Sequence, residues 1–172
     1  IILDLNITAK YTNTPTTAVN DYLKSQVAKV TFSNANVTSA TYYIKTTRAG
    51  TASANTVESC GTDTNPGSCT SATTKSLAAN TWYKVSGNIN VTYSATATST
   101  ATLTTLIYDG NNYSEAKAFT VAKIDAEKPT VTLGTATSTT NSITIPYTLA
   151  DAKTGIKSYT CKYSATSGSY TI

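Results

Sequence analysis

The chemistry open to this chain rests on three cysteines and nine carboxylates, because the sequence contains no histidine. Without an imidazole, the Ser-His-Asp and Cys-His arrangements of nucleophilic catalysis are excluded within the chain. The carboxylates are scattered along the sequence, and none of them form the paired signature typical of glycoside hydrolysis. The residue types therefore predict a protein that is not an enzyme.

Two of the cysteines flank a segment rich in turn-forming residues. Cys60 and Cys69 enclose GTDTNPGS, which contains the tripeptide Asn65-Pro66-Gly67. We predict a disulfide between them, which would stabilise the fold by roughly 2–3 kcal/mol through loop entropy. The alternative is two unrelated thiols, and zinc is disfavoured because two cysteines without histidine cannot complete a usual ligand set. A disulfide indicates an oxidising compartment, and Cys161 is left without a partner.

Four carboxylates could supply oxygen ligands to calcium at a junction between domains. Asp125 and Glu127 lie in a short charged segment, and Asp109 or Asp151 could approach it. The simpler alternative is a solvated charged linker, and four candidate carboxylates do not define a site. We expect no other cofactor or metal.

One tryptophan gives a further candidate for binding. Trp82, with the adjacent Tyr83, could form an aromatic platform on which a sugar ring stacks. An exposed Trp82 ring beside a groove would support this hypothesis, whereas a ring buried in the core would exclude it.

The composition predicts a β-protein whose surface is polar but largely uncharged. Serine and threonine make up about a third of the chain, and only 13% of residues are charged. Threonine suits strands because its branched Cβ restricts χ1 while its hydroxyl tolerates water. The net charge of +4 includes no run of Lys or Arg, so we expect no nucleic-acid partner. No stretch approaches the roughly 20 apolar residues of a membrane helix, so we expect no membrane insertion in this segment.

Alternation of apolar and polar residues predicts about seven strands before residue 124. The clearest alternation runs from Ile1 to Tyr11. Residues 18–26 could instead form one or two helical turns, because Leu23 and Val27 lie four residues apart. The other expected strands are residues 27–32, 41–46, 81–85, 89–93, 101–108 and 116–124, with Val30, Phe32, Tyr42 and Ile44 facing inward. The polar region 49–79 contains the predicted disulfide and is expected to form short strands or an excursion.

A hairpin and a linker divide the chain into two predicted domains. Strands 101–108 and 116–124 are joined by the turn Asp109-Gly110-Asn111-Asn112, and residues 125–129 form a charged linker ended by Pro129. We predict an all-β sandwich over residues 1–124 and the N-terminal half of a second one over residues 130–172. Its four expected strands are residues 131–133, 143–149, 156–163 and 169–172.

The junction resembles that of tandem bacterial immunoglobulin-like, or fibronectin-III-like, surface domains. YDGNNYSEAKAFTVAKIDAEKPTV is similar to a closing strand of that family followed by Ile-Asp and Pro-Thr-Val. The turn departs from the family pattern, since it reads Asp109-Gly110-Asn111. TTNSITIPYTLADAKTGIKSYTCKYS is similar to the opening half of the next domain, where Gly155-Ile156-Lys157-Ser158-Tyr159 matches the Gly-Ile-x-x-Tyr strand. The resemblance covers residues from about 100 to 172 and implies immunoglobulin-like β-sandwich domains in tandem.

This resemblance implies an extracellular structural or adhesion module of a bacterial surface protein, such as a stalk or scaffold repeat. The expected partners are neighbouring domains of the same chain, a host or matrix protein or glycan, or a second copy. Two alternatives are a glycan-binding module and a pilus-like filament subunit assembled by β-strand donation.

The second domain is expected to be incomplete, because four strands cannot bury both inner faces of a sandwich. The apolar residues left uncovered would be Ile143, Ile145, Tyr147, Leu149 and Tyr159. Continuation of the chain beyond Ile172 would supply the missing strands and a partner for Cys161. The alternative is a strand from another subunit, with Ile1–Tyr11 as donor. Pairing of that strand within its own domain would exclude it as the donor.

Overall fold

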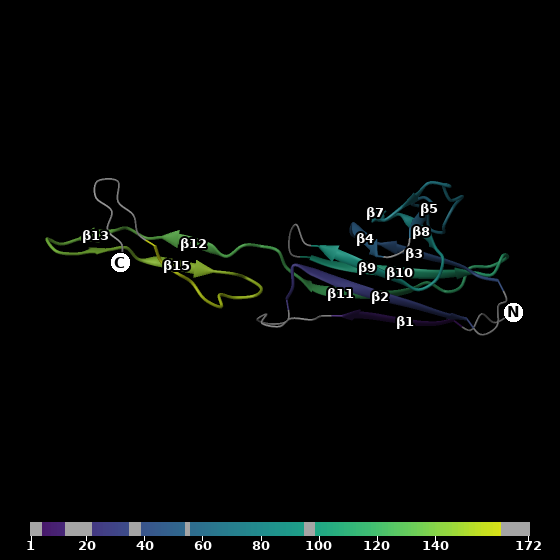
Figure 1. Ribbon diagram of the computed structural model, residues 1–172, viewed down its shortest axis with the longest axis horizontal. Coiled ribbons are helices and arrows are strands. Elements are labelled where there is room, and N and C mark those ends of the chain that lie inside the picture. The colour runs from purple at the N-terminus through teal and green to yellow at the C-terminus, as the bar shows by residue number, and fades with distance from the viewer. Residues whose placement is uncertain (1–4, 13–21, 35–38, 54–55, 95–98, 163–172) are drawn as a thin grey trace. The chain divides into compact units, whose positions relative to one another are not determined.

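The computed structural model describes residues 5–12, 22–34, 39–53, 56–94 and 99–162, and within these ranges the chain is all-β with antiparallel sheets (Figure 1). It divides into two compact units, residues 1–127 and 128–172, and each is described below by itself. The division falls within the predicted linker 125–129.

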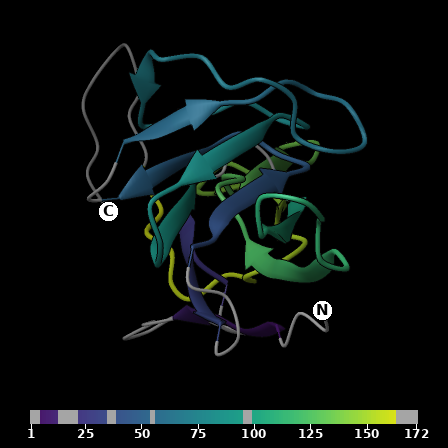
Figure 2. The ribbon, with the colours of Figure 1, turned by 90° about the vertical axis from the view of Figure 1, so that its right-hand side faces the viewer.

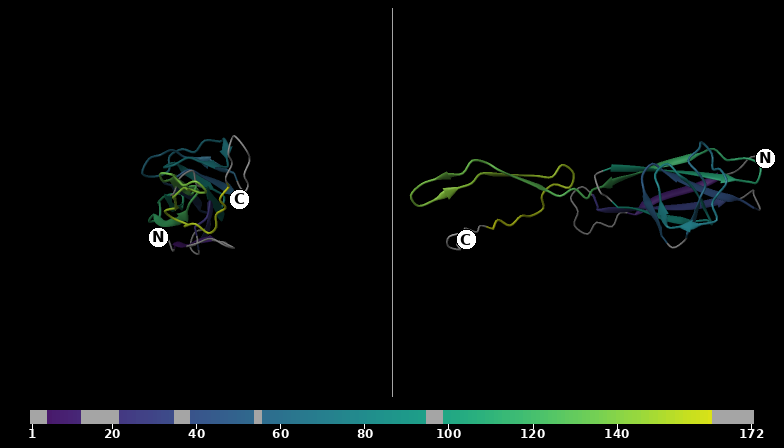
Figure 3. Two further views of the ribbon diagram at one scale, coloured as in Figure 1. Left: turned by 90° about the vertical axis from the view of Figure 1, so that its left-hand side faces the viewer. Right: turned by 90° about the horizontal axis from the view of Figure 1, so that it is seen from above.

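Unit 1 contains two antiparallel sheets, which Figure 2 and Figure 3 show from one end and from above. The five-stranded sheet has the order β1-β2-β9-β4-β7 and the six-stranded sheet the order β11-β10-β3-β8-β5-β6. The first sheet is made of β1 (Leu5–Thr12), β2 (Ser25–Asn34), β9 (Ile89–Ser94), β4 (Gly50–Ser53) and β7 (Ser76–Leu77). The second is made of β11 (Lys117–Ile124), β10 (Ser99–Tyr108), β3 (Thr41–Thr46), β8 (Trp82–Val85), β5 (Val57–Ser59) and β6 (Thr73–Thr74).

The main core lies between the two sheets. Strand β9 shows the alternation most clearly, since Ile89, Val91 and Tyr93 are buried while the residues between them face outward. Ile44 and Leu103 come to the same core from the six-stranded sheet. The predicted inward residues are confirmed, with Val30 and Ile44 fully buried and the rings of Phe32 and Tyr42 packed at the margin of the core.

A second, smaller hydrophobic cluster lies on the other side of the six-stranded sheet. It is made by Tyr43, Cys60, Trp82 and Leu106. Tyr43 and Ile44 are adjacent on β3 and both buried, so this strand is covered on both faces. Successive strand residues point to opposite faces, and a strand with two buried neighbours must therefore carry a layer on each side. The covering layer here is the loop between Cys60 and Cys69.

Several predicted elements are confirmed in detail. The expected strand 41–46 coincides with β3, and β10 and β11 form the predicted antiparallel hairpin. The region 49–79 forms the four short strands β4 to β7, as expected of an excursion with strands of its own. These short strands raise the number in unit 1 to eleven among the described residues, more than the predicted seven.

The predicted helix over residues 18–26 is wrong for its described part. Leu23 forms a parallel bridge with Ile124, and β2 begins at Ser25; residues 18–21 lie outside the described residues. A strand forms here instead of a helix because Gln26, Ala28 and Val30 are buried at every second position. Leu23 and Val27, which the helix would place on one face, are only partly buried.

Two strands predicted for unit 2 are also corrected. The expected strand 143–149 is interrupted, and its two pieces are β14 (Ile143–Thr144) and β15 (Tyr147–Ala150). Pro146 falls in the gap, where its missing N–H cannot join a ladder. Residues 156–162 of the other expected strand have no strand structure, since no neighbouring strand among the described residues pairs with them.

Unit 2 is a long antiparallel hairpin with no buried hydrophobic residue among those described. Strand β12 (Thr130–Leu133) pairs with β15, and β13 (Thr137–Ser138) pairs with β14. The predicted uncovered face is confirmed: Ile143, Ile145, Tyr147 and Tyr159 are exposed and Leu149 is half-buried, and Val131 and Leu133 are exposed as well.

Candidate functional site

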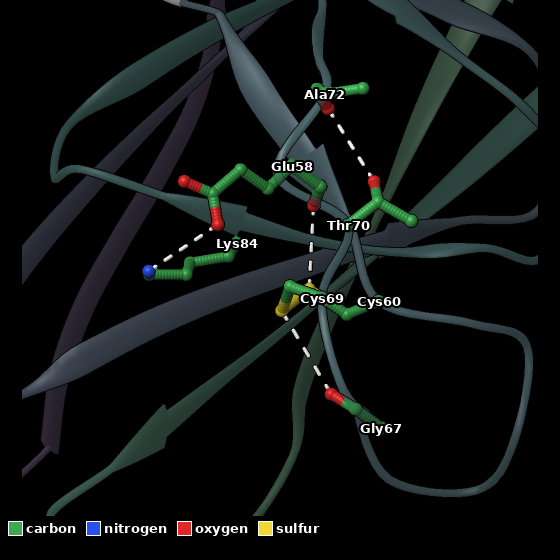
Figure 4. A network of polar contacts seen from close by, with 7 residues as sticks. All are labelled: Glu58, Cys60, Gly67, Cys69, Thr70, Ala72 and Lys84. Carbon is green, nitrogen blue, oxygen red and sulfur yellow. Dashed lines mark hydrogen bonds and ion pairs between the residues drawn. A yellow bond between two sulfur atoms is a disulfide. The ribbon is translucent and has the colours of Figure 1, made fainter.

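The predicted disulfide between Cys60 and Cys69 is confirmed and closes a loop over the six-stranded sheet (Figure 4). The Cys60 sulfur lies 3.3 Å from the Glu58 carbonyl oxygen, and the Cys69 sulfur lies 3.9 Å from that of Gly67. Cys60 is fully buried within the second hydrophobic cluster. The bond therefore belongs to the packed part of the fold, which is typical of structural disulfides.

Side chains from the sheet hold this loop from below. The indole Nε1–H of Trp82 donates to the carbonyl oxygen of Asp63 at 3.0 Å, and Lys45 Nζ donates to the same oxygen at 3.4 Å. The Tyr113 hydroxyl donates to the carbonyl oxygen of Pro66 at 3.0 Å. The loop is thus fixed at its middle as well as at its ends, and its own N–H of Gly67 bonds the Cys60 carbonyl oxygen at 2.8 Å.

Aromatic rings fill the space beneath the loop. The ring of Tyr113 lies 4.7 Å from that of Tyr108 and 6.2 Å from that of Tyr43, measured between centroids. Burial, together with the nearby Tyr113, Tyr108 and Glu58, raises the pKa of Tyr43 above its ordinary value of 10.0. Lys45 Nζ lies 4.7 Å from the centroid of the Trp82 ring, a cation–π contact. The cluster is a packed layer whose polar atoms bond to the loop.

The glycan platform predicted at Trp82 and Tyr83 is wrong. The two residues are only 2% and 4% exposed and lie on opposite faces of the six-stranded sheet, Trp82 under the loop and Tyr83 in the main core. The Tyr83 hydroxyl accepts a hydrogen bond from the Ala78 N–H at 2.8 Å. A sugar could not stack on either ring without unfolding what covers it.

Within unit 1, the predicted calcium ligand Asp109 lies apart from Asp125 and Glu127. Asp109 lies in the turn that joins β10 to β11, whereas Asp125 follows the other end of β11, with Glu127 beside it. Asp151 belongs to unit 2. Asp125 is nearly buried, and its carboxylate accepts the Glu127 N–H at 2.9 Å. No group of three or more His, Cys, Asp or Glu side chains that could hold a metal occurs in the described ranges.

Two of these carboxylates stabilise turns instead. Asp109 accepts the N–H groups of Asn111 and Asn112 at 2.7 and 2.6 Å, and these bonds to the charged form lower its pKa. Asp151 accepts the N–H groups of Lys153 and Thr154 at 3.0 and 2.8 Å, with the same effect on its pKa. Both are Asx turns, in which a side chain replaces a backbone acceptor.

Cys161 is a free, exposed thiol in unit 2. Tyr147 and Tyr159 lie near it, with ring centroids 5.9 Å apart. Hydrogen bonds from Tyr147 to Tyr159 and Cys161 help raise the pKa of Tyr147 to about 12, with the bond to Tyr159 as the main cause.

Sequence reasoning missed the residues of the second hydrophobic cluster, above all Tyr43, Leu106 and Tyr113. A signal was present, because Tyr42-Tyr43-Ile44 and Leu106-Ile107-Tyr108 are apolar at successive positions. Such runs are typical of strands covered on both faces.

Comparison with protein-family models, curated proteins and solved structures finds no significant match to this chain. Among the described residues, none belongs to a helix of the length and apolar character that crossing a membrane requires.

Proposed function

We propose that this chain is a non-catalytic structural or adhesion module of a bacterial surface protein, built from immunoglobulin-like β-sandwich domains in tandem. It acts as a spacer or scaffold, and its nearest partners are neighbouring domains of the same polypeptide. Its place is the cell surface or the extracellular medium.

The strand order of unit 1 supports the immunoglobulin-like part of this proposal. Immunoglobulin domains of the constant type place strands A, B, E and D in one sheet and C, F and G in the other. The order β1-β2-β9-β4 corresponds to the first sheet, and β3-β10-β11 to the second. Strands β5 to β8 are additional and carry the disulfide-closed loop.

The disulfide-closed loop is the observation that carries the proposal. Cys60 is buried, and the loop covers Trp82 in the second cluster, so formation of the bond is part of folding. Disulfides of this kind persist where the surroundings are oxidising. Of the side chains considered for binding, Trp82 holds the loop, and Asp109 and Asp151 stabilise turns, which favours a structural role.

Strand donation by the N-terminal strand is not favoured as an alternative. Strand β1 pairs with β2 at every position from Leu5 to Thr12. Its hydrogen-bonding edge toward β2 is therefore occupied within unit 1, and this strand is not free to complete another subunit.

Surface labelling of the cells that produce the protein tests the proposal. A membrane-impermeant biotin reagent is applied to intact cells, followed by alkylation of free thiols before and after reduction. We expect labelled protein in which Cys60 and Cys69 react only after reduction, while Cys161 serves as an internal free-thiol control. Protein that is labelled only after lysis, with all three cysteines already reactive, would contradict an extracellular module.

A further inference from the structure

Strand β11, the last strand of unit 1, is irregular near its end, and no sequence pattern predicts this irregularity. The register of β10 with β11 shifts between Ser99 and Ala101, because Ser99 lies opposite Ile124 and Ala101 opposite Val121. The one extra residue of β11 forms a bulge, and Lys123 adopts φ = 59° there. A left-handed conformation is uncommon for a residue with a long side chain, and bulges re-aim the groups of a strand.

At the bulge the backbone of β11 stays paired with β10 through Ile124 and Ser99, and it also bonds to the segment that leads into β2. The Lys123 carbonyl oxygen accepts the N–H of Leu23 at 3.1 Å and the side-chain Nε2–H of Gln26 at 3.1 Å. The N–H of Asp125 then donates to the Leu23 carbonyl oxygen at 2.8 Å. These bonds form a parallel connection between Leu23 and Ile124 that joins the two sheets at one end of unit 1. We name Leu23, Gln26, Lys123, Ile124 and Asp125 the exit clamp.

Gln26 is an unusual residue for the place it occupies. It is only 1% exposed, and its Oε1 atom has no hydrogen-bond partner among the described residues. A buried amide oxygen without a partner costs free energy that an apolar side chain of the same size would not cost. What the amide does provide is a bond from β2 to the end of β11. This suggests that the connection has a use other than equilibrium stability.

The ends of the first and last strands of unit 1 lie at opposite ends of β2. Tension applied through the chain therefore loads the strand ladders in shear. Leu5, at the start of β1, lies opposite Asn34 at the end of β2, whereas Ile124 lies beside Leu23, just before β2 begins. The two points are separated by about 36 Å along β2, at the strand rise of roughly 3.3 Å per residue. Within unit 1, Figure 1 shows β1 and β11 running alongside β2. A pull that separates these points acts along the strands, across many ladder bonds at once.

We propose that unit 1 bears tension between its first and last strands, and that the exit clamp fastens β11 against being drawn out under that tension. The inference rests on the proposed role as a spacer of a surface protein. Shear loading requires all bonds of a strand to fail together, whereas peeling breaks them one after another. Strand β11 pairs with only one other strand, β10, and the clamp adds one bond from Gln26 of β2 and two bonds with Leu23 just before β2.

Pulling single molecules in two directions tests this geometry without disturbing the clamp. Handles are attached to the full chain at its two ends, or at its first residue and an Asn111→Cys thiol, both in a Cys161→Ser background. Asn111 is exposed and lies in the turn between β10 and β11, at the end of unit 1 where β1 begins. End-to-end pulling is recognised by a length gain of roughly 370 Å, since the disulfide withholds its loop from extension. We expect unit 1 to survive at least tenfold longer, at equal force, when pulled from its ends.

Two matched variants separate the clamp from general stability. Gln26→Met removes the amide but keeps a buried side chain of similar shape, and Lys123 retains its bond from Leu23. We expect unchanged unfolding by denaturant but an end-to-end lifetime under force about fivefold shorter, as for one lost hydrogen bond. The control is Tyr93→Phe, which removes the buried bond from Tyr93 to Thr46 between the interior strands β9 and β3. It should lower stability to denaturant while changing the lifetime under force little.

Equal lifetimes in the two pulling directions would overturn the inference, and so would a Gln26→Met lifetime equal to that of the unaltered chain. Neither result would bear on the surface location of the protein, which is measured separately by labelling of intact cells. If the protein were cytosolic but still showed the directional difference, the exit clamp would stand and the proposed role as a surface spacer would be wrong.

Discussion

The two units of this chain have similar strand patterns but opposite degrees of burial. In unit 1, Leu103 is fully buried between two sheets, whereas Leu133 on β12 of unit 2 is 66% exposed. Both leucines lie on antiparallel strands with paired neighbours. The difference is that the two sheets of unit 1 enclose a core between them, whereas the two short sheets in the described part of unit 2 bury no residue. An alternating pattern thus specifies a strand and its face, while the core needs an opposing layer.

The comparison also shows how much a polar group costs in each setting. The hydroxyl of Tyr93 is buried in unit 1 and donates to Thr46 at 3.0 Å. Tyr147 of unit 2 is exposed, and its hydroxyl forms hydrogen bonds with the side chains of Tyr159 and Cys161. The first bond compensates for burial, while the second forms in competition with water and contributes little to stability.

Truncating a leucine in each unit should give the largest contrast. Leu103→Ala leaves a cavity in the main core and should lower the free energy of unfolding of unit 1 by about 3–4 kcal/mol. Fluorescence of Trp82, the only tryptophan, reports denaturant unfolding of this unit. Leu133→Ala should change the hydrogen-exchange protection of β12 and β15 by less than about 0.5 kcal/mol, because its side chain is exposed. A cost above about 2 kcal/mol for Leu133→Ala would mean that this face is covered in solution.

Removing the disulfide should have the next largest effect, and again in unit 1 alone. The double substitution Cys60→Ser and Cys69→Ser should destabilise unit 1 by about 2–3 kcal/mol through loop entropy. Loosening of the loop should also expose Trp82 and shift its emission to longer wavelength. Cys161→Ser is the control in unit 2 and should change neither quantity, since that thiol is exposed. An unchanged melting temperature after removal of both loop cysteines would contradict a structural role for the bond.

Alkaline titration should separate two tyrosines that share a raised pKa for different reasons. Burial raises the pKa of Tyr93 to about 12, opposed in part by its bond to Thr46. Because the folded pKa is raised, the stabilisation is complete below the ordinary value of 10.0 and is lost as pH rises through about 12. At pH 11 the loss should be about 1.4 kcal/mol in unit 1. Tyr93→Phe should remove this pH dependence.

The pKa of Tyr147 is also raised to about 12, mainly by its hydrogen bond to Tyr159. Its ionisation should not unfold unit 1, and Tyr159→Phe should return its pKa toward 10.0. Ultraviolet absorbance of phenolate measures both steps. Ionisation of Tyr93 without unfolding of unit 1 would mean that its ring is not buried in solution.

Much of the fold of unit 1 was predictable, because its strands follow a period of two. Ile89, Val91 and Tyr93 are buried as their alternation indicates, and Cys60 and Cys69 pair as the turn between them predicts. The position of Trp82 was not predictable from its type, since an aromatic residue suits both a core and a binding surface. Trp82 belongs to a core because a loop covers its ring. That loop is held by the hydrogen bond from Trp82 to Asp63, which no local sequence pattern encodes.

The exit clamp was beyond sequence reasoning for a related reason. Gln26 is a polar residue at an inward position, and Lys123 is one of several lysines in strands. Their association joins residues 97 positions apart. Local propensity carries no information on such a contact, and the strained backbone of Lys123 is a consequence of tertiary structure. The helix predicted over residues 18–26 failed in its described part for the same reason, because Leu23 is committed to a bridge with Ile124.

The smallest effect is expected where the two units are most alike, at the Asx turns of Asp109 and Asp151. Hydrogen bonds from backbone N–H groups lower the pKa of both carboxyls below the ordinary value of 3.8, chiefly from Asn112 in the first turn and Lys153 in the second. Because the folded pKa is lowered, each contribution is present above pH 3.8 and is lost as the pH falls through the folded pKa. Both residues are partly open to solvent, so the change in stability should be small.

The two turns should nevertheless respond differently to substitution. Asp109→Asn should lower the stability of unit 1 slightly at pH 7 and not at all at low pH, because the turn closes the β10–β11 hairpin of a cooperative domain. Asp151→Asn should change only the exchange of nearby amides such as that of Thr154, since unit 2 has no core among its described residues to transmit the effect. Carboxyl chemical shifts measured against pH would check both directions. If either carboxyl had a pKa at or above 3.8, its turn would not form in solution. If Asp151→Asn altered a cooperative unfolding transition of unit 2, that unit would be more completely folded than its exposed hairpin indicates.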